Sequence, residues 1–367
     1  AAVLAGTGVG GLMTLEEQVG VLLGRGPDRV SPLLVPMMMA NATAGTISIH
    51  LGWTGPNLCI ATACAAGAHA IGEAVRLLRD GSCDVVVAGG TESSQTPTAI
   101  SAFARMGALS GRNDDPGHAS RPFDAARDGF VMGEGAGFLV LETMEHAEAR
   151  GARILGEVLG YGRNGDAHHI TAPAPGGTGA AACMRLALAD AGLDPADVRS
   201  INAHGTSTPL NDASESAAIA DVFGVGRVPV TSTKGVTGHL VGAAGAVEAI
   251  VALLTYARIQ IKAGAMTTGE FTSFLVALLM LYEPVKRLTG IHNIFQQALG
   301  ASQKVFEYLD REERVRDMPN ATPTPRFAQS VRFENVRFVY PNSPEGFELS
   351  GVNFEVRAGE VMALARS

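Results

Sequence analysis

The chain contains 367 residues, of which 46% are hydrophobic and 17% charged, and it carries a formal net charge of −8. This length allows two or three domains, each with a sizeable core. The acidic balance argues against a nucleic-acid partner, because phosphate contacts require a basic surface. Glycine occurs 45 times and aromatic residues make up only 5%, a composition typical of helices packed closely on sheets.

Cysteine usage predicts a reduced protein without a metal or another cofactor. The four cysteines, Cys59, Cys64, Cys83 and Cys183, form no CxxC pair and no zinc-type spacing with histidine. A cytoplasmic location therefore fits better than a disulfide framework. All but Cys64 are interpreted as small core residues. The first residues lack Met and a basic segment, so we expect no signal peptide and a chain that starts inside a longer sequence.

The part up to about residue 250 alternates short apolar runs with amphipathic segments. Residues 84–90 and 137–142 are predicted as buried strands, because each is a short apolar run that begins or ends at glycine. Residues 64–81 and 180–192 are predicted as helices, because apolar side chains recur there at helical spacing. Strands that alternate with helices indicate a layered α/β architecture.

The later part of the chain follows a different pattern. Residues 271–282 are an unbroken apolar run, which is shorter than the roughly twenty residues of a membrane span and favours a core helix. This run continues into a longer helical pattern, and residues 247–261 form a second apolar stretch upstream. A membrane hairpin over residues 247–310 is therefore an open alternative. Beyond a proline-rich linker, residues 331–338 and 349–356 are predicted as strands.

A glycine-rich loop near the N-terminus has two interpretations. Residues 6–11 read GTGVGG and formally match the dinucleotide fingerprint GxGxxG, with Asp28 near the distance expected of a ribose-binding acid. However, Asp28 falls in a turn-like segment, residues 25–29, and not at the end of a second strand. We therefore favour a plain glycine-rich loop over a nucleotide site.

Cys64, His204 and His239 form a candidate site for acyl transfer, because each lies in a small-residue segment at the predicted end of an element. A thiol at a helix N-terminus is expected to have a lowered pKa, since unpaired N–H groups and the helix dipole favour the thiolate. Such a thiolate can accept an acyl group from a thioester. Two neutral imidazoles can then donate to an enolate oxygen while a carboxylated donor loses carbon dioxide. The residues alone leave open the alternative that both histidines are ordinary core residues.

Five segments carry the most specific sequence patterns. They are ATAC at 61–64, SRPFD at 120–124, RDGFVMGEGAG at 127–137, NAHGTSTP at 202–209, and the stretch from STK to AVE at 232–248. Through them, residues 1 to about 250 resemble the β-ketoacyl-acyl-carrier-protein synthases, most closely the type II condensing enzyme of fatty-acid elongation. The resemblance implies a partial thiolase-like layered αβαβα fold and decarboxylative Claisen condensation of an acyl thioester with malonyl-acyl carrier protein.

The same resemblance implies roles for individual residues. Cys64 would be the nucleophile, and His204 and His239 would be the paired decarboxylation histidines. Lys234 would support His239, and Glu248 would order the site by hydrogen bonding. On residue type alone, a solvated lysine and a surface glutamate would be the preferred interpretations of the last two.

Substrate and partner contacts are also implied by the resemblance. Thr206 and Thr208 match positions that bind the pantetheine arm, and Phe103 falls where the acyl pocket is lined; on residue type alone they would be turn threonines and a core phenylalanine. The partners would be acyl carrier protein with its phosphopantetheine arm and a second copy of the chain, paired around residues 56–62. The family's first strands and its C-terminal Gly-Phe-Gly-Gly loop are not matched. That loop supplies an oxyanion-hole donor, whose loss typically costs on the order of 100- to 1,000-fold in rate.

From about residue 256 the sequence resembles an ABC exporter instead. Residues 271–310 match its last membrane helix, and the strands after the linker match the opening of its ATPase domain. Tyr340 matches the aromatic residue that stacks on adenine. Because no GxxxxGK[ST] phosphate loop is matched, ATP binding is not expected, and a plain strand aromatic is the favoured interpretation of Tyr340.

These patterns together predict a layered α/β fold followed by a long apolar helix and a small β-rich fragment. The predicted domains are an incomplete ketoacyl synthase at residues 1–250, an exporter membrane-helix region at 251–316, and a linker with a truncated ATPase start at 317–367. The predicted function is a β-ketoacyl-acyl-carrier-protein synthase. An exporter fragment that associates with a membrane and an inactive chimeric chain are the alternatives.

Overall fold

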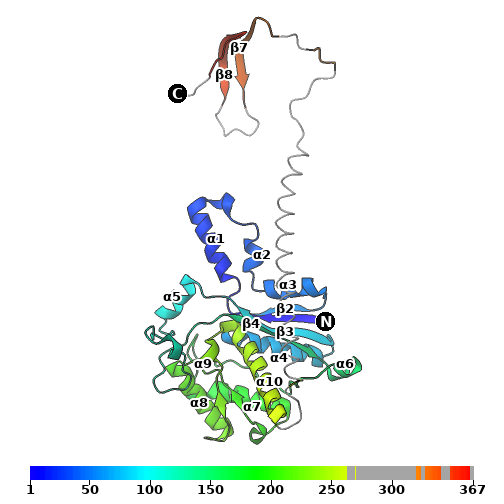
Figure 1. Ribbon diagram of the computed structural model, residues 1–367, viewed down its shortest axis with the longest axis vertical. Coiled ribbons are helices and arrows are strands. Elements are labelled where there is room, and N and C mark those ends of the chain that lie inside the picture. The colour runs from blue at the N-terminus through cyan, green and yellow to red at the C-terminus, as the bar shows by residue number, and fades with distance from the viewer. Residues whose placement is uncertain (263–268, 270–319, 324–326, 340–347, 364–367) are drawn as a thin grey trace. The chain divides into compact units, whose positions relative to one another are not determined.

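The computed structural model describes residues 1–262, 269, 320–323, 327–339 and 348–363 (Figure 1). The chain divides into two compact units, Ala1–Leu278 and Leu279–Ser367. The larger unit contains all the residues of the predicted site except Tyr340, which lies outside the described residues.

A four-stranded sheet forms the first half of the larger unit. Its strands are β1 (Ala2–Gly6), β2 (Asn57–Ile60), β3 (Val85–Glu92) and β4 (Gly135–Glu142), in the order β2-β1-β3-β4. β1 is parallel to β2 and to β3, and β4 is antiparallel to β3. The carboxyl ends of the three parallel strands therefore meet at one edge, where the chain carries Thr7, Cys64 and Glu92.

Both faces of this sheet are covered by helices, and the alternation of side chains along β1 explains why (Figure 1). Ala2 and Leu4 are buried in a core with α4 (Ala66–Arg79), whereas Val3 and Ala5 are buried with Ala44 of α3 (Ala42–Leu51). A strand with apolar residues on both faces requires such a cover on each side. The predicted strands and the predicted helix after Cys64 are thus confirmed.

A second, smaller sheet forms the other half. It pairs β5 (Ile201–Asn202) in parallel with β6 (Val230–Thr231), and it packs with α7 (Thr178–Ala191) and α8 (Pro209–Phe223) around Ala203, Ile219 and Val228. α10 (Ala244–Lys262) contacts α4 and joins the two halves, because the Asn202 side chain donates to the Glu248 carbonyl over 3.3 Å. The layers are α3, the large sheet, α4 with α10, the small sheet, and α7 with α8. This is the predicted αβαβα layering.

Shorter elements complete the larger unit. They are α1 (Leu12–Arg25), α2 (Leu34–Met38), α5 (Pro97–Arg105), α6 (Met144–Ala149), α9 (Lys234–Thr237), and the 3-10 turns η1 (Pro27–Arg29), η2 (Ala63–Ala65), η3 (Pro116–His118), η4 (Pro175–Gly177), η5 (Pro195–Asp197) and η6 (Val241–Ala243). Asp28 lies in η1, a turn as predicted. Gly6 ends β1 against α4, where a Cβ atom would lie 2.3 Å from the Ala66 carbonyl oxygen. The first glycine of the fingerprint-like loop therefore serves close strand–helix packing.

Of the two predicted membrane segments, the structure describes only the first. The upstream apolar stretch, residues 247–261, lies in α10, which packs on α4, β3 and β4. Among the described residues, no helix combines the length and the apolar character needed to cross a bilayer. The first arm of the predicted membrane hairpin is thus a packing helix of the layered fold. The predicted long helix at 271–310 lies outside the described residues.

The described part of the second unit is a β-hairpin. β7 (Ser330–Phe338) pairs antiparallel with β8 (Leu349–Arg357), which confirms the two strands predicted there. Phe333 and Phe354 stack across the pair with ring centroids 4.3 Å apart, and Arg332 pairs with Glu355 at 3.1 Å. The domain boundaries predicted at 250 and 316 stay predictions.

Candidate active site

Cys64 lies in η2, between the end of β2 and the first turn of α4. The preceding Ala63 has a φ angle of 50°, a left-handed conformation that a residue with a Cβ atom rarely adopts. Strain of this kind persists only where the surrounding structure holds it, and it is common at functional sites. The sharp turn places the thiol at the N-terminus of α4, as the sequence predicts.

The expected lowering of the thiol pKa is wrong in this structure. Burial raises the pKa of Cys64 above its ordinary value and outweighs the lowering by the Lys234 ammonium and by the backbone N–H of Cys64 itself. The charges of Glu92 and Glu248 raise it further. At Cys64, desolvation therefore penalises the thiolate more than the Lys234 charge and the backbone N–H favour it.

His204 and His239 converge on the thiol from the second half of the unit. The Nε2 atom of His239 lies 3.0 Å from the Cys64 Sγ atom, although the two residues are 175 positions apart. The two imidazole rings are 5.3 Å apart and nearly perpendicular, at 84°. One potential ligand atom from each of the three residues lies within 4.8 Å of the other two. The predicted Cys/His/His cluster is therefore present as a single site.

Both imidazoles are neutral at physiological pH. Burial lowers the pKa of His239 to about 3, with a further contribution from the Lys234 charge, and the same two causes hold the pKa of His204 well below its ordinary value. The Nδ1 atom of His239 is buried without a hydrogen-bond partner among the described residues. A bare ring nitrogen is less costly there than an unpaired N–H, which favours the tautomer with its proton on Nε2. His239 then donates toward the Cys64 sulfur.

Lys234 and Glu248 form a buried ion pair beside this cluster. Lys234 is only 1% exposed, which excludes the solvated lysine that its residue type alone would favour. A buried ammonium requires a partner, and Glu248 of α10 therefore fixes the position of Lys234. The Lys234 charge is in this way held near both histidines. The Ser120 hydroxyl donates to the Lys234 carbonyl and ties the SRPFD segment to the same place.

Thr206, Thr208 and Phe103 lie around the cluster in two separate groups. The Thr206 and Thr208 hydroxyls are 2.9 Å apart, and Thr208 also caps α8 by accepting the Asn211 N–H. Phe103 of α5 packs edge-on against Phe130 at 5.4 Å, and Phe130 packs edge-on against His239 at 5.2 Å. An aromatic path thus leads from Phe103 to the imidazole.

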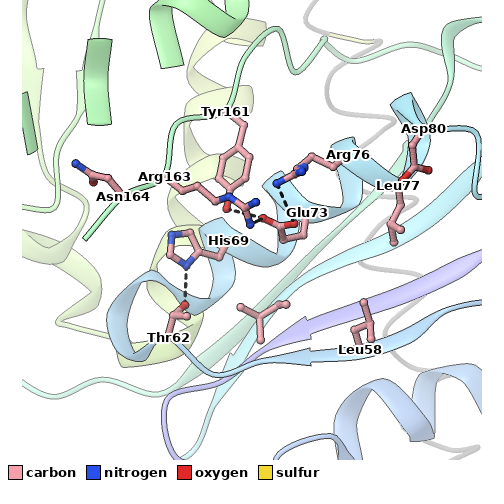
Figure 2. Close-up of a pocket in the computed structure, with 11 residues that line it drawn as sticks. Leu58, Thr62, His69, Glu73, Arg76, Leu77, Asp80, Tyr161, Arg163 and Asn164 are labelled. Carbon is pink, nitrogen blue, oxygen red and sulfur yellow. Dashed lines mark hydrogen bonds and ion pairs between the residues drawn. The ribbon is translucent and has the colours of Figure 1, made fainter. Parts of the chain in front are cut away.

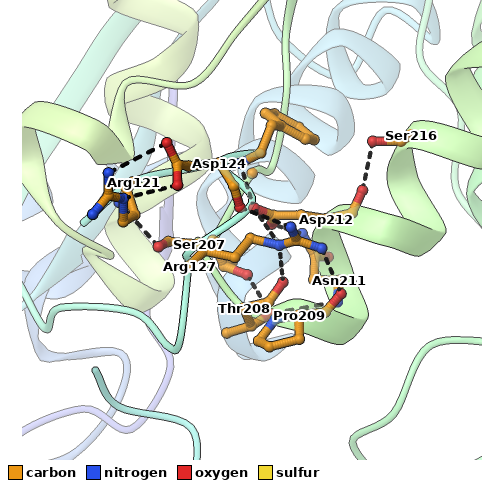
Figure 3. A network of polar contacts seen from close by, with 12 residues as sticks. Arg121, Asp124, Arg127, Ser207, Thr208, Pro209, Asn211, Asp212 and Ser216 are labelled. Carbon is orange, nitrogen blue, oxygen red and sulfur yellow. Dashed lines mark hydrogen bonds and ion pairs between the residues drawn. The ribbon is translucent and has the colours of Figure 1, made fainter. Parts of the chain in front are cut away.

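A polar network holds Ser207 and Thr208, which follow His204 in the same loop (Figure 3). Asp212 is 1% exposed, pairs with Arg127 at 3.6 Å and accepts the Phe123 N–H over 2.7 Å. Arg127 also donates to the Thr208 carbonyl over 3.2 Å. These contacts explain why the segments SRPFD and RDGF belong to the site although neither carries a reacting group.

Two buried carboxylates at the site are absent from the prediction. Glu215 of α8 accepts the backbone N–H groups of His204 and Gly205, each over 2.7 Å. Glu92, at the end of β3, accepts the N–H of Gly8 over 2.6 Å and that of Gly242 over 3.0 Å. Glu92 therefore joins the loop after β1 to η6, the turn between His239 and α10. Glu92 gives a weak signal in the sequence, because it follows an apolar run, whereas Glu215 lies among polar and small residues and gives none.

An open cavity of about 790 Å³ lies along α4 and is lined from β2 and from the segment around Tyr161 (Figure 2). It is lined in part by Thr62, His69, Glu73, Tyr161 and Arg163, and the His69 ring lies 2.8 Å from the Thr62 hydroxyl. The Glu73 carboxylate pairs with Arg163 and accepts from the Tyr161 hydroxyl over 3.2 Å. The three side chains of the Cys/His/His cluster do not line this cavity.

Comparison with known proteins gives the family of this fold and site. Residues 1–147 match the family model of the β-ketoacyl synthase N-terminal domain, and residues 155–264 match that of the C-terminal domain. The chain is 53% identical over 257 residues to 3-oxoacyl-[acyl-carrier-protein] synthase 2 of Synechocystis sp., a match that covers 70% of this chain and 62% of that protein. The enzyme of the same name from Staphylococcus aureus is 50% identical over 252 residues, with 68% and 62% covered.

Solved structures give the same result. A β-ketoacyl synthase from Burkholderia phymatum is similar with a TM-score of 0.65 and 39% identity, over 70% of this chain and 62% of that one. A type II PKS acyl-carrier protein in complex with its ketosynthase gives a TM-score of 0.67 and 35% identity, over 69% and 64%. The chain thus spans 62% of the length of the two curated relatives named above. Residues 1–264 are a ketoacyl synthase II-like segment and belong to the β-ketoacyl synthase family.

Proposed function

We propose that residues 1–264 act as a β-ketoacyl-acyl-carrier-protein synthase, which condenses an acyl thioester with malonyl-acyl carrier protein in fatty-acid elongation. The observation that carries the proposal is the convergence of Cys64, His204 and His239, with 3.0 Å between the Cys64 sulfur and the His239 Nε2. A nucleophile beside two neutral donors fits acyl transfer followed by enolate chemistry. The alternative of two ordinary core histidines does not account for a strained turn that holds a thiol against them.

In the first half-reaction, the Cys64 sulfur attacks the carbonyl carbon of the acyl thioester. A carbon–sulfur bond to the enzyme forms, the bond to the carrier breaks, and the thiol proton leaves with the carrier sulfur. Because burial raises the thiol pKa, the free thiolate must be stabilised locally. The Lys234 ammonium supports this, since its charge lowers the same pKa.

In the second half-reaction, the malonyl group loses carbon dioxide and leaves an enolate. His204 and His239 donate from Nε2 to the enolate oxygen, a role that requires the neutral imidazoles found at this site. The enolate carbon attacks the acyl-Cys64 carbonyl, the carbon–sulfur bond to the enzyme breaks, and the released Cys64 thiolate takes up a proton from solvent. Lys234 and Glu248 act as positioning residues for this donor pair.

The substrate in this proposal arrives on acyl carrier protein. Thr206 and Thr208 would bind the pantetheine arm, and Phe103 would line the acyl pocket at the far end of the aromatic path to His239. A partner of this kind is supported by the similar ketosynthase solved with its acyl-carrier protein. We further propose a cytoplasmic homodimer that pairs through β2, because β2 is an edge strand of its sheet in the described part of the chain.

The proposal is tested by following both products of condensation from acyl- and malonyl-acyl carrier protein. We expect 3-oxoacyl product and carbon dioxide in equal amounts from the unaltered chain. His204→Ala and His239→Ala should each lower carbon dioxide release by about 100-fold or more, the range of a lost oxyanion donor. A folded chain that releases no carbon dioxide with any acyl-chain length would overturn the proposal. Cys183→Ser, a thiol of α7, is the matched control.

A second candidate concerns only the part after residue 256. We propose that it derives from an ABC exporter, and the observation in favour is the antiparallel β7–β8 hairpin after the proline-rich linker, as expected for the opening of an ATPase domain. On this view the two parts have different origins, and the chain is a chimera. Genomic sequence across codons 240–265 tests this join, because one continuous native reading frame across it would contradict a chimera made by assembly or recombination.

A further inference from the structure

The Cys/His/His cluster presents three metal-ligand atoms to one point. They lie within 4.8 Å of one another, and the Cys64 sulfur and the His239 Nε2 are 3.0 Å apart. In a tetrahedral zinc site, bond lengths of about 2.3 Å to sulfur and 2.0–2.1 Å to nitrogen place neighbouring ligand atoms about 3.3–3.6 Å apart. The 3.0 Å separation lies just below that range and no pair exceeds 4.8 Å, so side-chain rotations would complete the geometry.

The surroundings admit a cation. Glu248 pairs with Lys234 and offsets part of the ammonium charge that faces the site. Cys64 and His204 are each only partly buried, which leaves a path for an ion. Cysteine with imidazole is a donor set suited to zinc and similar thiophilic ions. Three protein ligands leave a fourth position open for water.

We propose that Cys64, His204 and His239 bind a thiophilic divalent cation such as Zn²⁺, and that the bound ion blocks the nucleophile. The Cys64 S–H proton is released to solvent as the sulfur–metal bond forms, and the sulfur lone pair is then no longer free to attack a thioester. The inhibition of Cys64 by the ion rests on the proposed function, whereas binding of the ion does not. Sequence spacing gives no sign of this site, because its ligands come together only in the fold.

One feature limits the strength of the site. Coordination through the His239 Nε2 moves its proton to Nδ1, which has no hydrogen-bond partner among the described residues. Imidazoles that bind metal normally donate that second N–H to an acceptor. The ion is therefore bound more weakly than in structural zinc sites and is removed by a chelator.

The test is a titration of the metal-free chain with Co²⁺, followed by displacement with Zn²⁺. We expect one Co²⁺ per chain with tetrahedral visible bands and a sulfur-to-cobalt charge-transfer band. Cys64→Ser should abolish the charge-transfer band, and His204→Ala and His239→Ala should each weaken binding by about tenfold or more. Cys183→Ser should retain the complete spectrum, and circular dichroism should verify that every variant is folded.

The outcomes separate this site from the proposed function. A missing charge-transfer band in the folded chain, or a band that survives Cys64→Ser, would overturn the metal site even if the acyl-enzyme forms. Metal bound through Cys64 in a chain that never becomes acylated would support the site while the proposed function fails. If both hold, bound Zn²⁺ should slow acylation of Cys64, and a chelator should restore its rate; unchanged acylation with Zn²⁺ bound would overturn the blocking step.

Discussion

The two halves of the larger unit hold their parts of the site by different interactions. The half that carries Cys64 is a four-stranded sheet between helices. It is held together by fully buried apolar residues such as Leu4 and Val86. The half that carries His204 has strands of only two residues. Its loops are held by buried charged side chains, chiefly Lys234 and Asp212.

This difference assigns separate tasks to apolar and polar contacts. Apolar packing is non-directional, and it suffices to place the turn of Cys64 at a sheet edge. The orientation of an imidazole requires directed contacts, which here are backbone N–H groups held by carboxylates. Glu92 contacts both halves, because it ends β3 of the first half and accepts the N–H of Gly242, which lies in η6. Substitutions in each half should therefore have distinguishable consequences.

Loss of the buried cation should have the largest effect. Lys234→Ala leaves Glu248 buried without its partner, and we expect the free energy of unfolding to fall by about 3–5 kcal/mol. Arg79→Ala is the matched control, since the Arg79–Asp190 pair is exposed and such pairs contribute about 0–1 kcal/mol. Chemical denaturation measures both, and equal losses in the two variants would contradict the assigned role of the buried pair.

Loss of apolar packing in the other half should rank next. Leu4→Ala removes a fully buried side chain and should cost about 2–5 kcal/mol. It should leave the pKa of Cys64 unchanged in the folded protein, whereas Lys234→Ala should raise that pKa because a nearby cation is lost. The rate of iodoacetamide alkylation against pH reports the thiol pKa. A similar shift in both variants would remove the distinction between the halves.

The residue shared by both halves should have a smaller effect on stability. Glu92→Gln replaces charged acceptors of the Gly8 and Gly242 N–H groups by neutral ones, and we expect a loss of about 1–3 kcal/mol. The same change should lower the pKa of Cys64, because the Glu92 charge raises it. This shift is opposite in sign to that of Lys234→Ala. Alkylation profiles that move in the same direction would show that the shifts are not electrostatic.

The neutral histidines predict a pH dependence that vanishes near pH 7. Folding lowers the pKa of His239 from about 6.5 to about 3, so the unfolded state binds more protons between these values. The stability that His239 contributes is thus present above about pH 6.5 and is lost as pH falls toward about 3. His239→Gln should flatten this acid limb in denaturation curves at several pH values. An acid limb that is unchanged in the variant would contradict a neutral His239.

The sequence predicts the layered fold well because its signals are local. The apolar run before Glu92 and the helical spacing after Cys64 each specify one element, and both elements are present. Cys64, His204 and His239 are found through short motifs around each residue. The motifs predict that the thiol and the imidazole share one site. The contact itself joins residues 175 positions apart and forms only when the chain folds.

Other properties of the site depend on neighbours that no local pattern names. A helix N-terminus predicts a lowered thiol pKa at Cys64, but burial by distant segments reverses the direction. In the sequence, little distinguishes Glu92, and nothing distinguishes Glu215, from other acidic residues. In the fold, each accepts backbone N–H groups from another segment. The role of a buried carboxylate is therefore read from the fold and not from spacing.

The central claim is that Cys64 is the acyl acceptor of this chain, and intact-mass analysis after incubation with an acyl thioester tests it most directly. We predict one acyl group per chain, located on the Cys64 peptide, lost in Cys64→Ala and retained in Cys183→Ala. A folded chain that takes up no acyl group from any acyl thioester, or one that is acylated equally after Cys64→Ala, would contradict the account.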